Sequence, residues 1–253
     1  MNTGQFLVCA VIAVLAGFLG GRISNRLMRS TATEADASTD AAARSSAGVR
    51  GRVTAREFVL VDKAGNERML LSVNEHNSAG MHLYDVKGKE LLVLAAGEDG
   101  TSGLSMSDSA GKLRLAVGVT KDGGPALVMN DSAEKTWLAV GVTKGGWPGL
   151  NMYDSAGKLR LAVDVGKDGA PGLDMYDSAG KRRLILAAGK DGAPGLVMCD
   201  STGKRLAVGV FADGMPTLTM YDSAGKDRAT MGVLKDDPYL QIVESEEDIW
   251  GAP

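Results

Sequence analysis

The 253-residue sequence has little of what most enzymes use for chemistry. It contains two cysteines, two histidines and only 5% aromatic residues. Cys9 lies in an apolar N-terminal stretch and Cys199 in a repeat, so a disulfide between them is not expected. No Ser/His/Asp order, His-Glu-x-x-His motif or metal-spaced Cys/His cluster occurs. We therefore expect no catalytic activity, no cofactor and no metal site.

The chain also lacks an excess of charge of either sign. Its 28 Lys and Arg oppose 31 Asp and Glu, which gives a net charge of −3. Without a basic bias, a nucleic-acid partner is not expected. The 34 glycines, by contrast, are abundant and fit a protein built from many short segments that are separated by turns.

One long uncharged apolar run occurs near the start, at residues 6–21, FLVCAVIAVLAGFLGG. With the uncharged residues before it, the run approaches the ~20 residues that a spanning helix needs. A cleavable signal peptide is the alternative, but it would begin with a basic region, and the first arginine is Arg22. We expect an uncleaved anchor helix over residues 1–29 that enters the membrane through residues 5–21.

The basic residues Arg22, Arg26 and Arg29 follow the apolar run, and only the α-amine precedes it. The positive-inside rule therefore favours a cytoplasmic body on a bacterial inner membrane, although so short an N-terminal tail leaves the side open. Residues 30–49 are rich in Ala, Ser and Thr and are expected to form a flexible linker.

Residues 50–243 repeat one unit eight times and end in a partial ninth, YLQIV. The spacing between the Asp residues that start one turn of each unit is 23 residues, except for the last, which is 22. A fixed period of this length indicates a repeat architecture in which no unit buries its own apolar face. These anchor residues are Asp62, Asp85, Asp108, Asp131, Asp154, Asp177, Asp200 and Asp222.

Within one unit, residues 149–171, apolar and other residues alternate. Leu150 and Met152 flank Asn151, and Leu161 and Val163 recur with the same period after the DSAGK segment. A period of two predicts two short β-strands with their apolar residues on one buried face.

Both connections of the unit have turn chemistry. DSAG places Asp at the start of a type I turn and Gly where φ becomes positive, which predicts a bulged hairpin. KDGAP supplies a second Asp-Gly turn, and its Pro precedes each new strand, where no ladder donor is needed. The recurring prolines are Pro125, Pro148, Pro171, Pro194, Pro216 and Pro238.

Tight turns at both ends of each strand favour an all-β antiparallel meander of about 16–17 short strands. Its continuous apolar face must curl on itself, close, or pair with another copy, because it is too large to stay in water. A two-sided β-solenoid and, third, a four-bladed propeller fit the same pattern. Residues 244–253 are expected to form an acidic C-terminal tail.

The MYDSAGKLRL segment resembles the YD repeats of rearrangement-hotspot and teneurin-type proteins, in which Tyr-Asp precedes x-x-Gly-Arg. The match covers only the repeat region, has Lys where Arg is usual, and lacks the Tyr in four copies. The resemblance implies a ribbon of β-strands, often wound into a shell. In layout the chain is also similar to uncharacterised bacterial proteins with a membrane anchor, a linker and D-x-x-G-K-x-R repeats; this similarity implies no activity.

Two columns of side chains are expected to point outward and to form a candidate ligand surface. Depending on strand register, Arg and Tyr lie opposite each other, with guanidinium groups over rings. A ladder that only keeps this face soluble is the alternative interpretation. The candidate residues are Tyr84, Tyr153, Tyr176, Tyr221, Arg114, Arg160, Arg183 and Arg228.

Together these patterns predict a membrane-tethered β-repeat scaffold or interaction protein without catalytic activity. The alternative function is a module that binds cell-envelope glycans through the Tyr/Arg columns. The expected partners are the membrane, a protein or glycan of unknown identity, and further copies of this chain.

Overall fold

A computed structural model describes residues 54–252 apart from 144 and 245–246. In these residues the chain forms β-strands and turns only, and no helix there has the length and apolar character that crossing a membrane requires. The expected anchor, residues 1–29, and linker, residues 30–49, lie outside the described residues.

The described residues form eighteen strands, one after another. Their bounds are β1 (Glu57–Val61), β2 (Glu67–Val73), β3 (Ala79–Tyr84), β4 (Glu90–Ala96), β5 (Ser102–Ser107), β6 (Leu113–Val119), β7 (Pro125–Asn130), β8 (Thr136–Val142), β9 (Pro148–Tyr153), β10 (Leu159–Val165), β11 (Pro171–Tyr176), β12 (Arg182–Ala188), β13 (Pro194–Cys199), β14 (Lys204–Val210), β15 (Pro216–Tyr221), β16 (Asp227–Leu234), β17 (Asp237–Glu244) and β18 (Glu247–Ala252).

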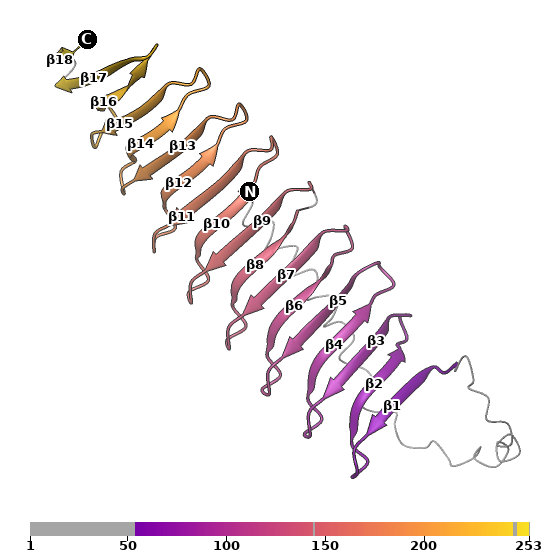
Figure 1. Ribbon diagram of the computed structural model, residues 1–253. Helices are drawn as coiled ribbons and strands as arrows, with labels where there is room; N and C mark the ends of the chain where they lie inside the picture. Colours follow the sequence, from indigo (N-terminus) through magenta and orange to yellow (C-terminus); the bar gives the residue numbers. More distant parts are fainter. Residues whose placement is uncertain (1–53, 144, 245–246, 253) are drawn as a thin grey trace, which may run out of the picture.

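Each strand pairs antiparallel with the strand before it and the strand after it, from β1–β2 to β17–β18. The result is one long open meander, drawn as a ladder of hairpins in Figure 1. At a strand spacing of ~4.8 Å, the ladder is roughly 80 Å long. The predicted antiparallel meander is confirmed. Closure of the sheet is wrong, as are the solenoid and the propeller, because backbone hydrogen bonds among the described strands join only those that are consecutive in the chain.

The strand number exceeds the expected 16–17 because β18 lies within the segment expected to be a tail. Its backbone pairs with β17, for example Gln241 with Gly251. Acidic composition alone gives no sign of this pairing.

The DSAGK turns have the predicted bulged geometry. In the unit of residues 149–171, Asp154 N–H donates to the Lys158 carbonyl at 2.9 Å, and Gly157 N–H donates to the Asp154 carbonyl at 2.8 Å. Gly157 has φ +77°, in the left-handed region that favours glycine. The strand register then shifts between Leu159 and Leu161, which is the bulge.

The alternation of side chains gives the sheet two different faces. We call one the apolar face; on β9 and β10 it carries Pro148, Leu150, Met152, Leu161 and Val163, and equivalent residues recur in the other units. We call the opposite one the mixed face; there the same two strands place Gly149, Asn151, Tyr153, Leu159, Ala162 and Asp164.

A column of small residues runs along the mixed face, where neighbouring backbones approach closely. Gly118 pairs with Gly103 of the preceding strand, and a Cβ on Gly118 would overlap the Ser102 carbonyl oxygen. Gly195 and Gly209 form an equivalent pair. Glycine is therefore required at Gly118 by packing rather than by φ.

The buried positions lie on the mixed face, on strands β6 to β10. The buried hydrophobic residues are small, namely Ala116, Ala126, Val128, Ala139 and Ala162. On the apolar face, by contrast, Met152 is 43% exposed and Val163 39%. The Leu/Met/Val face was expected to be buried, and the described strands leave it partly exposed, because the open sheet has no second layer of described strands over this face.

Candidate functional site

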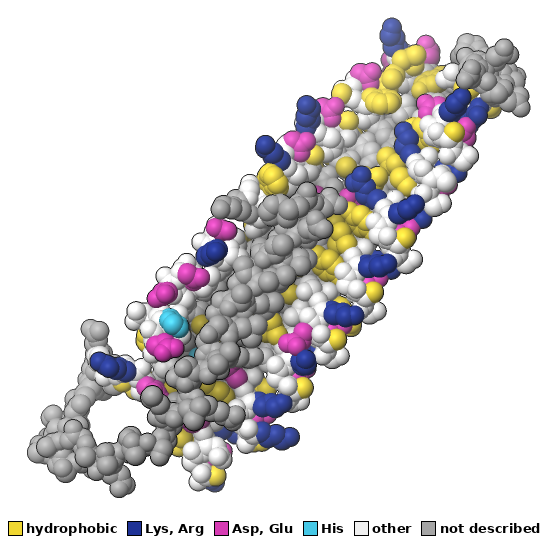
Figure 2. Space-filling view, turned by 180° about the vertical axis from the view of Figure 1, so that it is seen from behind, with side chains coloured by type: hydrophobic (Ala, Val, Ile, Leu, Met, Phe, Trp, Pro, Cys, Tyr) yellow, Lys and Arg dark blue, Asp and Glu magenta, His cyan; other side chains and the backbone are white. Residues whose placement is uncertain are grey.

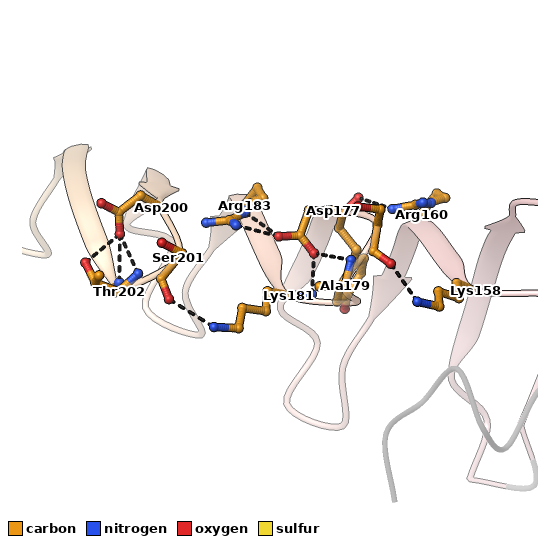
Figure 3. Close-up of polar contacts among 12 residues, drawn as sticks. Lys158, Arg160, Asp177, Ala179, Lys181, Arg183, Asp200, Ser201 and Thr202 are labelled. Atoms are coloured by element: carbon orange, nitrogen blue, oxygen red, sulfur yellow. Dashed lines mark hydrogen bonds and ion pairs between the residues drawn. The ribbon is translucent and has the colours of Figure 1, made fainter.

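The anchor Asp of each repeat binds its own turn. In the Asp177 turn, Oδ1 accepts hydrogen bonds from the backbone N–H groups of Ala179 at 2.8 Å and Lys181 at 2.9 Å. The other oxygen, Oδ2, accepts one from Nε of Arg183 at 2.7 Å (Figure 3). One carboxylate therefore stabilises the turn and holds Arg183 on the next strand.

The same pairing recurs along the ladder with varying closeness. Arg160 approaches Asp154, and Arg228 approaches Asp222, to 2.7 Å. Arg114 lies farther from Asp108, at 3.9 Å. The four arginines of the candidate ligand surface thus all face the carboxylate of their own hairpin.

Lysine and arginine side chains also connect each repeat to the next. Lys158 Nζ donates to the Ser178 carbonyl at 2.8 Å, and Lys181 Nζ donates to the Ser201 carbonyl at 3.1 Å (Figure 3). Arg160 donates to the Tyr176 carbonyl at 3.5 Å. The D-S-A-G-K-x-R pattern is therefore explained by bonds within and between hairpins.

These bonds lower the pKa of seven anchor carboxyls below the ordinary value. For six of them the main cause is the backbone N–H group four residues later, and for Asp200 it is the hydroxyl of Thr202. Hydrogen bonds to the charged form stabilise it. The seven residues are Asp62, Asp85, Asp108, Asp154, Asp177, Asp200 and Asp222.

The four tyrosines of the candidate surface lie at the ends of β3, β9, β11 and β15, on the mixed face and half-buried. Burial raises the pKa of Tyr153 and of Tyr176. In the part of the chain that the structure describes, the cation over a tyrosine ring is Lys204, with Nζ 3.7 Å from the Tyr221 centroid. The expected stacking of arginine on these rings is not found there, because the arginines turn toward the aspartates.

An acidic cluster on the mixed face was not predicted from the sequence. Asp174 accepts hydrogen bonds from the Tyr176 hydroxyl at 3.3 Å and from Arg182 at 3.1 Å. Burial, and then the charge of Asp174, raise the pKa of Asp164. Asp164 occupies a position that holds Gly, Ala or Ser in other repeats, and the position of Asp174 holds no other acidic residue, so both depart from the repeat pattern.

A groove along the apolar face was not predicted from the sequence. It has a volume of about 970 Å³ and runs across β6 to β13. Valines and prolines at the KDGAP ends of the strands line it, including Val119, Pro125, Val142, Pro148, Val165 and Pro171. A second groove of about 640 Å³ continues it toward β17.

Charged side chains lie at the two long edges of the molecule. Figure 2 shows Lys and Arg alternating with Asp and Glu along these edges, with hydrophobic side chains between them. The turns form these edges, since β-strands run from one to the other (Figure 1). The edges are therefore ionic, and the strands between them carry the apolar surface.

The described residues hold no group of three or more His, Cys, Asp or Glu that suits a metal ion. Where the structure describes the chain, the one close His–carboxylate hydrogen bond joins His82 Nδ1 to Glu90 at 2.7 Å. His82 also stacks against Tyr84, with ring centroids 6.4 Å apart.

No protein-family model matches the chain, and no curated protein does. Among solved structures, TcdB2-TccC3 without its hypervariable C-terminal region is similar, at a TM-score of 0.24 and 14% identity over 75% of this chain. A porin-like protein from Bacteroides uniformis is similar at a TM-score of 0.19 and 8% identity, over 72% of this chain and 91% of that one. The chain spans only 11% of the TcdB2-TccC3 chain. The similarity to TcdB2-TccC3 is distant, and scores this low carry no conclusion about function.

Proposed function

We propose that this protein is a non-catalytic scaffold that a membrane anchor at residues 1–29 holds at a bacterial inner membrane, with the repeat body on the cytoplasmic side. The observation that carries the proposal is that the charged and the apolar side chains of the repeat have different surroundings. The charged groups of the repeat bond to their own and neighbouring hairpins, while the face of Leu, Met, Val and Pro stays open along the ladder.

The ladder suits a scaffold because it repeats one surface at a fixed distance. Each unit adds two strands, or ~10 Å of length. Contacts that are weak one by one then add through avidity, provided that the partner matches the spacing. The partner is a protein that presents apolar groups, because the open surface is apolar and the arginines at its DSAGK edge already pair with aspartates.

A series of full-length chains with different numbers of repeats tests this proposal. Deletion of residues 149–171 or 149–194 removes one or two whole units and rejoins the chain at an equivalent turn. We expect the amount of chemically cross-linked partner recovered from native membranes to fall stepwise with each unit removed. A single substitution such as Asp177→Asn is the control and leaves recovery nearly unchanged. Complete loss from that substitution, or no loss from either deletion, contradicts a tiled scaffold.

The tether is tested separately by protease treatment of intact cells and spheroplasts, followed by mass analysis of the N-terminus. Protection of the body in spheroplasts, with Met1 or Asn2 retained, supports a cytoplasmic body. Digestion in spheroplasts contradicts that orientation, and a new N-terminus beyond residue 21 contradicts the anchor.

A glycan-binding module is the second candidate. The observation in its favour is that Tyr153 and Tyr176 end β9 and β11 on one face, two strand spacings or ~10 Å apart, a spacing that suits an extended repetitive polymer. Replacing Tyr153, Tyr176 and Tyr221 with Ala then abolishes retention on cell-envelope polysaccharide without unfolding the chain. Unchanged retention, or none in the parent protein, excludes this function.

A further inference from the structure

We infer that the apolar face binds a second copy of this chain, and that the two ladders lie face to face and parallel. This inference goes beyond the scaffold proposal, since it names the surface and its occupant. Only the choice of a parallel arrangement rests on the proposed tether.

The composition and area of the face support a protein partner of the same kind. On β5 to β16 the face carries Leu, Met, Val, Pro and Ala with one Ser102, and no charged side chain interrupts it. Its Met and Val columns are between one-third and one-half exposed. Together they present on the order of 1,000 Å², above the ~800 Å² per partner of a standard interface and the few hundred Å² usual on monomers.

The arrangement of columns makes this face complementary to itself. On β9, Met152 lies at the edge formed by the DSAGK turns, and Pro148 lies at the opposite edge, where the groove runs. We place a two-fold axis between the two facing sheets, parallel to the length of the ladder. This axis brings the DSAGK edge of one copy over the KDGAP edge of the other. The methionines of one copy therefore lie over the groove of the other. Met is unbranched and flexible, which suits it to fill such a groove.

The same axis leaves positions along the ladder unchanged, so that each repeat faces its own counterpart. The 22–23-residue period therefore stays in register over the whole length, which an unrelated partner would have to reproduce. Both β1 strands then lie at the same end. Two chains tethered to one membrane require that placement.

The edges allow this approach of two copies. At the edge formed by the DSAGK turns the aspartates already pair with arginines of the same hairpin, for example Asp222 with Arg228, so these carboxylates do not repel a second copy strongly. Two sheets then pack with ~10 Å between them, as in a β-sandwich. Pairing with another copy would cover this face, which no second layer of described strands covers.

Cysteine cross-linking in native membranes tests the inference. Full-length chains with two different tags, both Cys9→Ser and Cys199→Ser, are co-expressed, one with Met220→Cys and the other with Val233→Cys. Within one chain Met220 pairs with Ala229, and Val233 lies four residues farther along β16, ~13 Å from Ala229. The two introduced cysteines are therefore too far apart to react within one chain. Mild oxidation is expected to give a disulfide-linked dimer that carries both tags.

The matched control uses the neighbouring residues on the mixed face, Thr219→Cys with Thr230→Cys. This pair is expected to give about tenfold less dimer or none, since the two mixed faces point away from each other. Equal cross-linking from both pairs, or no dimer from Met220 and Val233, overturns the inference. Cross-linking of Met220→Cys to a different protein instead of the second copy also overturns it.

A charge placed on the apolar face provides a second test. Val208 is 38% exposed, so Val208→Asp leaves the single chain folded, as an unchanged tryptic fragment pattern will verify. It lowers the yield of Met220–Val233 dimer on the order of tenfold, because the carboxylate would be buried in the interface. Ser223→Asp, on an exposed turn, leaves the yield unchanged. Equal yields from both variants contradict the interface.

A further pair of introduced cysteines tests how the two copies are oriented, separately from the tether. An antiparallel dimer would join Met106→Cys to Met198→Cys, and that cross-link overturns the parallel arrangement. The N-terminus could prove to be cleaved while the Met220–Val233 dimer still forms. This result would contradict the tether and support the dimer.

Discussion

At the scale of single residues, the two oxygens of the anchor aspartate have separate tasks. In Asp177 one oxygen accepts two backbone N–H groups and the other accepts an arginine N–H. A longer or a neutral side chain would lose either the bonds to the backbone N–H groups or the bond to the arginine. This explains why Asp starts every such turn. The position is therefore structural, and its charge is not available to a ligand.

Asn151 departs from the repeat in a way that affects stability. Its side chain is 3% exposed, and its Nδ2 group finds no hydrogen-bond acceptor among the described residues. The equivalent position on β7 is Val128, which is 2% exposed. We expect Asn151→Val to raise the free energy of unfolding by about 1–2 kcal/mol, because a buried donor without a partner loses its hydration.

The measurement is the midpoint of urea unfolding of the full chain, followed by far-ultraviolet circular dichroism. The reverse change, Val128→Asn, serves as control and is expected to lower the midpoint. A lower midpoint for Asn151→Val would show that the amide has a partner.

At the scale of elements, the hairpins differ in how closely their backbones approach. Gly118 on β6 has no space for a Cβ, since the Ser102 carbonyl and the Gly103 Cα lie against it. Gly172 on β11 lies in the same column of small residues on the mixed face. A Cβ there would meet only Asp164 Oδ1 at 3.7 Å and the Leu186 carbonyl oxygen at 4.0 Å. One column of the repeat therefore contains a required glycine and a replaceable one.

We expect Gly118→Ala to lower stability by about 1–3 kcal/mol, because the β5–β6 pair must separate to admit the methyl group. Gly172→Ala is expected to be neutral or to add about 0.5 kcal/mol, through the reduced entropy of the unfolded chain. Thermal unfolding of both variants checks this, and equal effects would contradict the packing argument.

At the scale of the whole molecule, stability is a sum of contacts between neighbouring hairpins, since hydrogen bonds join only consecutive strands. Lys158 and Arg160 extend this coupling from one repeat to the next. Repeat arrays of this kind behave approximately as one-dimensional chains of coupled units. Conditions that weaken one repeated contact therefore act on all units at once.

Acid is such a condition. The pKa values of the seven anchor carboxyls are lowered on folding, so the stabilisation they give is complete above the unfolded pKa, about 4. It is lost as the pH falls from there through the folded values. The pKa of Asp164 is raised, so protonation of this residue favours the folded chain. This opposite effect comes from one residue, whereas seven anchor carboxyls act in the first sense.

We therefore expect the unfolding midpoint of the full chain to decrease steadily below pH ~4 and to stay nearly constant between pH ~5 and ~7. Asp177→Asn is expected to weaken this decrease, because it removes one of the titrating groups. A midpoint that rises on acidification would mean that the anchor carboxylates are not bonded in the folded chain.

The sequence by itself determined the hairpin, its two turns, the bulge and the division of residues between two faces. All of these depend on interactions within about 23 residues: Asp and Gly set the turns, and a period of two sets the faces. The same local information predicted which residues of successive units are equivalent, as Tyr153 and Tyr176 are at the ends of β9 and β11.

Only the tertiary structure decided how the hairpins are joined and which side chains bond. Alternation fits an open sheet, a closed one and a solenoid equally well, because the period is the same in all three. The arginines of the candidate surface turn to their own aspartates, as Arg183 does to Asp177, because that carboxylate lies nearer than any ring. The sheet stays open because its hydrogen bonds join only consecutive strands, and this leaves its most hydrophobic face uncovered by the described strands.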